Sequence, residues 1–231
     1  MTTPPPRRPR RQQQRAIDTR QRIIDTASRL FVMDGYEGTS VRDIIDSAQT
    51  SKGALYLHFP EGKLGVAKAI MKDTLTMDGL QQQRFMLQEI IDIGMILAHR
   101  ICNEIALQAA LKLSIHNDAP KLYTTPWPEW IQFNVMQLTQ AQERGEILQY
   151  VSPEEQAYQI AGNWAGIVLM APILDGDLGR VEERISRMYR NLLRALAAPE
   201  LLPELDFSAH RGKILYNEFL DGLATAPPEE S

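Results

Sequence analysis

The residues best suited to chemistry lie between Thr50 and Tyr56, and the chemistry they suggest is phosphate recognition. Lys52 and Tyr56 are one helical turn apart, with Gly53 between them. An ammonium group and a phenol can both donate hydrogen bonds to phosphate oxygens, and glycine has no side chain to hold a DNA backbone away. Thr50 and Ser51 come at the start of the segment, where hydroxyls and free backbone N–H groups can bind phosphate. The pattern predicts a helix that lies against a DNA backbone and groove.

Two short helices joined by a tight turn must hold these residues in place. Ser40 and Asp43 have the spacing of a capping box, which marks the start of the first helix. Its apolar positions recur at the spacing of one helical face: Val41, Ile44, Ile45 and Ala48. Gln49 and Thr50 form the expected turn, and Ser51 is the expected cap of the second helix.

The second helix has an inward and an outward face. Leu55 and Phe59 lie one turn apart and face inward, whereas the lysine and the tyrosine lie on another face. Arg42 on the preceding helix and Lys63 at the start of the following helix can flank the outward surface. This is the arrangement of a helix-turn-helix that reads DNA. The alternative is a small helical hairpin with a solvated lysine and tyrosine.

The distribution of charge favours a polyanion as partner for the front of the chain. The net charge of −4 combines +5 over residues 1–75 with −9 over residues 76–231. Residues 1–15 hold four prolines and five arginines, so we expect a disordered basic arm there. Such arms can track DNA phosphates or enter a minor groove, with Arg10 and Arg11 as candidate contacts. A solubilising tail is the alternative.

The remaining sequence also has helical periodicity, so we predict an all-α fold. No segment shows the period-two alternation of a β-strand. Further helices are expected over residues 16–33, 63–80, 85–102, 103–115, 127–144, 154–174, 178–198 and 208–223. A loop containing Pro120 and Pro126 is expected over residues 116–126.

The segment from Thr39 to Phe59 resembles the DNA-binding domain of TetR-family transcriptional regulators. Residues 22–36 fit the first helix of that domain. The resemblance implies a homodimer whose two recognition helices occupy successive major grooves of a near-palindromic operator. Positions that contact the phosphate backbone in the family match Lys52, Tyr56 and His58. The stretch that lies closest to DNA matches Thr50, Ser51, Gly53 and Leu55.

Two departures from the family pattern affect this match. Gln49 stands where the turn usually has glycine, and a left-handed conformation is less favourable for glutamine. The segment from Pro60 to Lys63 is one residue longer than the common form, which weakens the match of that lysine. The predicted domains are a disordered arm over residues 1–15, a helix-turn-helix domain over 16–62 and a ligand-binding and dimerisation bundle over 63–225.

Aromatic and methionine side chains in the rear part suggest a site for a lipophilic ligand. The candidate lining residues are Trp127, Trp130, Phe133 and Met95. Asn163 sits in an otherwise apolar helix, where a buried amide needs partners and could orient a ligand carbonyl or hydroxyl. The alternative is that these side chains form an ordinary core.

The rear part also resembles the autoregulator receptors that bind γ-butyrolactones, butenolides and related furans. The similarity lies in residues 91–100, 109–114, 126–130 and 163–166. It implies a tryptophan in the pocket, with Trp130 as the better match and Trp127 as the second choice. Members of this subgroup often have threonine where the chain has Asn163. The resemblance implies a repressor of secondary-metabolite genes that a small lipophilic signal releases from its operator.

The late helices, over about residues 154–198, are the predicted dimer interface. Their apolar repeat exceeds what one small bundle needs: Val181, Ile185, Met188, Leu192 and Leu196. In the family, two helices from each subunit form an isologous interface, so the operator should share its symmetry.

Other classes of protein are less well supported. His99 and Cys102 are two potential ligands without a third, so we predict no metal site and no cofactor. No phosphate-cradling glycine loop or nucleophile motif points to an enzyme. The single cysteine and the absence of a long apolar run predict a cytoplasmic protein without a membrane span. The alternatives are a regulator of the same fold without a small-molecule inducer, and a helical enzyme or scaffold.

Overall fold

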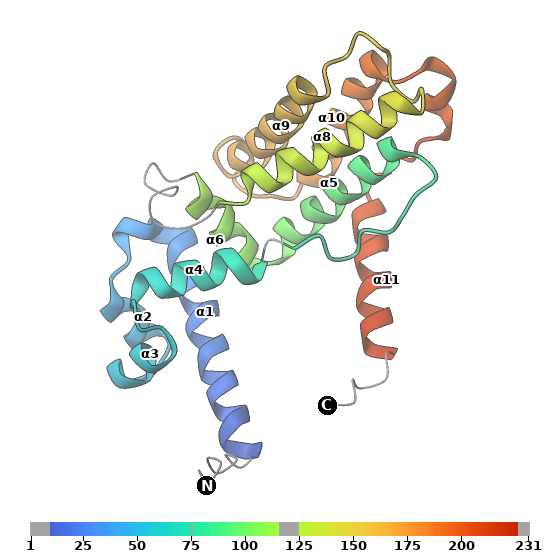
Figure 1. Cartoon of the computed structure of the whole chain (residues 1–231). Helices are drawn as coiled ribbons and strands as arrows, with labels where there is room; N and C mark the ends of the chain where they lie inside the picture. Colours follow the sequence, from blue (N-terminus) through green and yellow to red (C-terminus); the bar gives the residue numbers. More distant parts are fainter. Residues whose placement is uncertain (1–9, 75, 116–124, 226–231) are drawn as a thin grey trace, which may run out of the picture. The chain divides into compact units, whose positions relative to one another are not determined.

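The computed structural model describes residues 10–74, 76–115 and 125–225, which fall into two compact units (Figure 1). The first unit comprises residues 1–75 and 105–125, and the second comprises residues 76–104 and 126–231. Both are helical, which confirms the predicted all-α class. Within the described ranges, β-structure is confined to an isolated bridge between Ile147 and Ala197.

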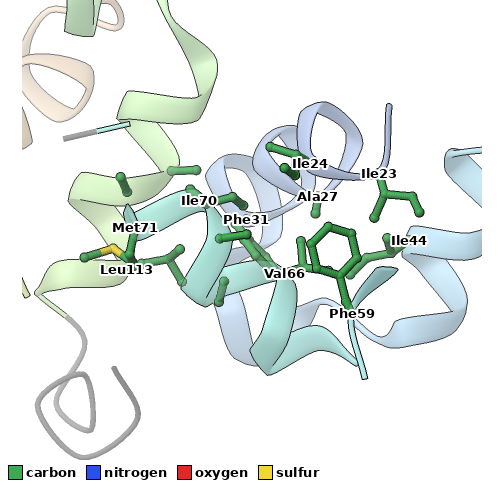
Figure 2. Close-up of a cluster of buried hydrophobic side chains, with 14 of the residues drawn as sticks. Ile23, Ile24, Ala27, Phe31, Ile44, Phe59, Val66, Ile70, Met71 and Leu113 are labelled. Carbon is green, nitrogen blue, oxygen red and sulfur yellow. The ribbon is translucent and has the colours of Figure 1, made fainter. Parts of the chain in front are cut away.

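The first unit is built around α1, which packs against every other helix described in the unit. Its helices are α1 (Arg10–Gly38), α2 (Val41–Ser47), α3 (Lys52–His58), α4 (Lys63–Thr74) and α6 (Ile105–Ser114). Figure 2 shows how their apolar side chains meet in one core. Ile23, Phe31, Ile44, Phe59 and Ile70 are among its members, and all are almost completely buried. The apolar stripes predicted for the helix-turn-helix therefore fix α2 and α3 onto α1.

The second unit is built around α5 (Met86–Asn103), which is buried along nearly its whole length. It packs against α8 (Trp127–Glu143), α10 (Val181–Leu196) and α11 (Arg211–Thr225). α9 (Pro153–Leu174) packs against α8 and α10, and the 3-10 helix η1 (Pro199–Glu204) follows α10. By length and composition α9 could cross a membrane, but the core helix of a soluble protein passes the same test.

The helix that begins the described chain starts earlier than predicted. Residues 10–15 belong to α1, so the expectation of disorder is wrong for that part of the arm, while residues 1–9 lie outside the described residues. Arginine and glutamine are good helix formers. The side-chain bond from Gln14 to Asp18 (2.9 Å) adds the i, i+4 support typical of an exposed helix. At the other end, Gly35 (φ 75°) interrupts the helix, as its sequence position predicts.

The compact units divide the chain at different places from the predicted domain boundary after residue 62. α4 and α6 share the core of α1, with Val66 and Leu113 packed in the same cluster as Phe31. α4 also ends at Thr74 rather than near residue 80, and Gly79 adopts a left-handed conformation (φ 89°) in the segment that follows. The predicted loop over 116–126 lies mostly outside the described residues.

Candidate nucleic-acid interface and ligand site

The start of α2 is fixed by the predicted capping box. The Ser40 hydroxyl accepts a hydrogen bond from the Asp43 backbone N–H (3.2 Å), and the Asp43 carboxylate accepts one from the Ser40 backbone N–H (2.8 Å). These hydrogen bonds to the charged form lower the pKa of Asp43 below its ordinary value. Asp43 therefore accepts the hydrogen bond that a glutamate accepts in the common form of this cap.

The turn between α2 and α3 has the strain that its sequence predicts. Gln49 lies in the left-handed region (φ 49°), where a glycine would be relaxed. The Thr50 backbone N–H donates to the Ile45 carbonyl (3.1 Å), which closes the turn. From α1, the Arg22 Nε donates to the Ala48 carbonyl (3.0 Å) and satisfies the end of α2. The angle between the two short helices is thus set by hydrogen bonds as well as by the core.

α3 has one face in the core and one face in solvent. Its cap, Ser51, accepts from the Ala54 backbone N–H (3.1 Å). Lys52, Gly53 and Tyr56 are exposed. The Tyr56 ring lies over Gly62, where an added Cβ would sit 3.4 Å from the ring. The lysine, the glycine and the tyrosine therefore form one accessible surface.

The structure changes the roles of two residues predicted to lie at DNA. Leu55 is completely buried in the core, so the expectation of a DNA contact from this side chain is wrong. The Lys63 ammonium donates to the Tyr36 carbonyl (2.8 Å) and lies 4.1 Å from the centre of the Tyr36 ring. Lys63 therefore ties α4 to the end of α1 instead of reaching freely into solvent.

The flanking candidates differ in accessibility. The Arg42 side chain is 88% exposed and makes a surface ion pair with Asp46 (3.5 Å), which a phosphate can displace. Thr50 and His58 are half-buried, and the His58 ring lies 6.4 Å from that of Phe59. Arg10 and Arg11 are the first residues of α1.

The sequence analysis does not include Leu57 in the outward surface of α3. The structure places it there, beside Tyr56 and 74% exposed. An apolar residue in a short helix is readily taken for core. The signal that could have identified it is its helical angle, which differs by about 160° from that of Leu55.

A second candidate site lies among aromatic rings in the second unit. The rings of Trp130 and Trp164 are 6.5 Å apart, and Phe133 stacks on Trp130 at 6.3 Å. The Trp164 Nε1 donates to the Gly94 carbonyl (3.0 Å). The Trp130 Nε1 is buried and has no hydrogen-bond partner in the part of the chain that the structure describes. A buried N–H without a protein partner is unfavourable unless a water molecule or a ligand accepts its hydrogen bond.

The other predicted lining residues differ in how far they are buried. Asn163 is exposed on α9, so the expectation of a buried amide is wrong. Because α9 is apolar on nearly all sides, its sequence does not show which side faces the bundle. Trp127 is half-buried, and Met95 is completely buried. The side-chain carbonyl of Asn134, which sequence reasoning missed, is a second buried polar atom without a partner among the described residues.

The histidine and cysteine of α5 have structural partners. The His99 Nδ1 lies 2.7 Å from a Glu182 carboxylate oxygen, and the Cys102 Sγ lies 3.5 Å from the Leu178 carbonyl. Burial raises the pKa of the Cys102 thiol to about 11, so the thiol stays protonated at neutral pH. Within residues 10–74, 76–115 and 125–225, no group of three or more potential ligands gathers around a metal position.

Comparison with known proteins agrees with this geometry. The family model for bacterial regulatory proteins of the tetR family matches residues 23–70. The chain is 31% identical to the A-factor receptor protein of Streptomyces griseus over 198 residues, which cover 84% of this chain and 69% of that protein. It is also similar to full-length TylP, a TetR regulator from Streptomyces fradiae, with a TM-score of 0.75 and 31% identity over 89% of this chain and 99% of that one.

A further solved structure shows the same fold at lower identity. It is a gamma-butyrolactone receptor, an ArpA-like protein, with a TM-score of 0.72 and 24% identity over 88% of this chain and 99% of that one. These relatives are transcriptional regulators and not enzymes. From its helix-turn-helix, its helical second unit and these similarities, the chain belongs to the TetR family of bacterial transcriptional regulators, which bind operator DNA as dimers.

Proposed function

We propose that the protein is a cytoplasmic repressor that a small lipophilic signal releases from a near-palindromic operator. The signal would be of the γ-butyrolactone, butenolide or furan type, and the regulated genes would serve secondary metabolism. The observation that carries the DNA-binding part is the exposed surface of Lys52, Gly53 and Tyr56 on a helix whose opposite face is locked into the core. Similarity to the A-factor receptor supports the class of signal.

In this proposal some residues contact DNA phosphates and others lie near the groove. Lys52, Tyr56 and Arg42 donate to phosphate oxygens, with His58 at the edge of the same surface. The α3 N-terminus, with Thr50, Ser51 and Gly53, approaches the groove most closely. Arg10 and Arg11, the first residues of α1, are proposed as further phosphate contacts.

Operator binding tests this surface. We expect Lys52→Gln and Tyr56→Phe each to weaken binding to the chain's own upstream DNA by tenfold or more at moderate salt. The reason is that each change removes a phosphate donor without touching the core. Fluorescence anisotropy would measure the affinity. Lys72→Gln, an exposed lysine in the last turn of α4, is the matched control. Unchanged binding by both α3 variants would refute the assignment.

The unpartnered N–H of Trp130 supports a ligand site in the second unit. A lactone or furan ligand has oxygen acceptors that can satisfy this donor, and the rings of Trp164 and Phe133 offer apolar contact to its alkyl part. The ligand must bind the released conformer more tightly than the DNA-bound one, because otherwise it shifts no population. A coupling of about 1–3 kcal/mol is enough for a usable switch.

The change Trp130→Phe tests this donor while it keeps an aromatic ring in place. We expect operator binding to stay intact, and release by a synthetic γ-butyrolactone or by culture extract to need at least tenfold more ligand. A gel shift measures both quantities, with Tyr150→Phe, a change at an aromatic residue that is 79% exposed in the second unit, as control. If neither ligand source releases the wild-type protein, a regulator without a small-molecule inducer becomes the better reading.

The exposed face of α9 supports a dimer through the late helices. Met170, Ile173 and Leu174 are exposed there, and added Cβ atoms at Gly162 and Gly166 would meet nothing within 4 Å. An apolar face with small residues suits close packing against a second copy. The proposed interface includes fewer residues of α10 than the sequence predicted. Three of the predicted α10 positions lie in the subunit's own core: Val181, Ile185 and Leu196.

A further inference from the structure

The second unit has a surface cleft that neither the DNA-binding surface nor the aromatic site uses. It has a volume of about 700 Å³ and lies between the second half of α10, η1 and the segment that follows η1. Its lining residues are Arg190, Arg194, Pro199, Leu202, Pro203, Leu205, Asp206, Phe207 and Ser208. This volume is within the range of clefts that hold small organic ligands.

Two arginines give the cleft its charge. Arg190 and Arg194 are four residues apart, so they lie on the same flank of α10, and both are exposed. Among the described residues, no carboxylate lies within ion-pair distance of either guanidinium. The carboxylate of Asp206 in the lining already accepts from Arg211 (3.0 Å) and from the Ser208 backbone N–H (2.8 Å). Within the part of the chain that the structure describes, the two positive groups of the cleft therefore form no ion pair.

Hydrogen bonds fix the segment after η1 that lines the cleft. The Gln88 side chain makes two hydrogen bonds with the Asp206 backbone, at 2.8 Å to its N–H and 3.2 Å to its carbonyl. The Ser186 hydroxyl donates to the Phe207 carbonyl, and the Arg190 guanidinium lies 5.6 Å from the centre of the Phe207 ring. A wall fixed in this way loses little conformational entropy when a ligand binds.

The cleft lies away from the flank of α10 that continues the proposed dimer face. With 3.6 residues per turn, Met188 and Leu192 lie about 160° round the helix from Arg190 and Arg194 respectively. Both are half-buried. A second copy that packs on α9 and on this apolar flank therefore leaves the arginines accessible.

We propose that this cleft binds a small organic anion, namely a carboxylate attached to a flat apolar body. The paired guanidinium groups match the carboxylate, since arginine donors bind two oxygens at once. The walls formed by Leu202, Leu205 and Phe207 match the apolar body. The site is separate from the aromatic site around Trp130, so the regulator has room for a second effector of a different chemical class.

Isothermal titration of the full-length protein with 2-naphthoate tests this site. We expect measurable binding, and at least tenfold weaker binding by the double variant Arg190→Gln with Arg194→Gln. The matched control is Arg187→Gln, an exposed arginine on the same helix that already pairs with Glu183 (2.6 Å). The neutral 2-naphthamide and inorganic phosphate should each bind at least tenfold more weakly, because each lacks one half of the recognised chemistry.

Several outcomes would overturn the proposal. The first is that the wild-type protein does not bind 2-naphthoate. The second is that the double variant binds 2-naphthoate as tightly as the wild-type protein does. The third is that the wild-type protein binds 2-naphthamide or phosphate as tightly as it binds 2-naphthoate. Loss of 2-naphthoate binding in Trp130→Phe would place the probe at the aromatic site instead. A change in oligomeric state of the double variant, measured by light scattering, would assign the arginines to an interface between copies. The titration uses no operator DNA, so its result is independent of the proposed repressor function.

Discussion

At the scale of single residues, Gly212 shows how closely two helices of the second unit approach each other. A Cβ added to this residue would collide with the backbone carbonyl of Met95 on α5, and backbone cannot move aside as a flexible side chain can. Gly222, on the same helix α11, is exposed, and an added Cβ there would meet nothing within 4 Å. The same substitution should therefore have opposite effects at the two positions.

We expect Gly212→Ala to lower the free energy of unfolding by about 1–3 kcal/mol or more, because the helices must separate. Gly222→Ala should raise it by up to about 1 kcal/mol, since alanine is the better helix former. Urea denaturation at a fixed protein concentration measures both values. Equal effects of the two substitutions would show that α11 does not pack on α5 as described.

At the scale of the helix-turn-helix element, the turn holds strain next to the proposed DNA-binding surface. Gln49 adopts a left-handed conformation (φ 49°) that is unfavourable for a residue with a Cβ, while the Arg22 bond to Ala48 and the core hold α2 and α3 in place around it. The conformation is thus imposed by the packing of the helices and not chosen by the turn residue itself.

We expect Gln49→Gly to raise the free energy of unfolding by about 0.5–1 kcal/mol. Relief of left-handed strain is worth roughly 1–2 kcal/mol, and the greater freedom of glycine in the unfolded chain offsets part of it. Thermal unfolding followed by circular dichroism would measure the change. Gln12→Gly, in the exposed first turns of α1, should instead destabilise. A less stable Gln49→Gly protein would mean that the glutamine side chain itself supports the turn.

At the scale of the whole molecule, the exposed apolar face of α9 needs a partner. Ile173 is 74% exposed, and an exposed apolar face of this kind indicates an association surface. We expect Ile173→Glu to convert a dimer to a monomer and to weaken operator binding by at least tenfold, because two half-sites are no longer bound together. Light scattering and anisotropy measure these two effects. The control is Met33→Glu, which changes an apolar residue that is 78% exposed in the first unit. A dimer that persists in the Ile173 variant would place the interface elsewhere.

Local patterns in the sequence were sufficient to predict the caps, the turn and the buried face of the helix-turn-helix. The capping box of Ser40 and Asp43, the turn at Gln49 and the inward positions of Leu55 and Phe59 all depend on residues within a few positions of one another. The structure has each of them. The start of α1 at Arg10 was missed because prolines and arginines before it suggested a continuous flexible arm.

The sequence by itself determined the helical class, the helix-turn-helix and the outward position of Lys52 and Tyr56 on α3, because these depend on helical period and capping. The tertiary structure alone decided that Asn163 faces outward, that Lys63 is bound to Tyr36 and that the Trp130 N–H is left without a partner. It also brought Arg190 and Phe207 together at one cleft. Burial and hydrogen-bond partners depend on which surfaces of distant segments meet, and a nearly uniformly apolar helix such as α9 carries no local record of that choice.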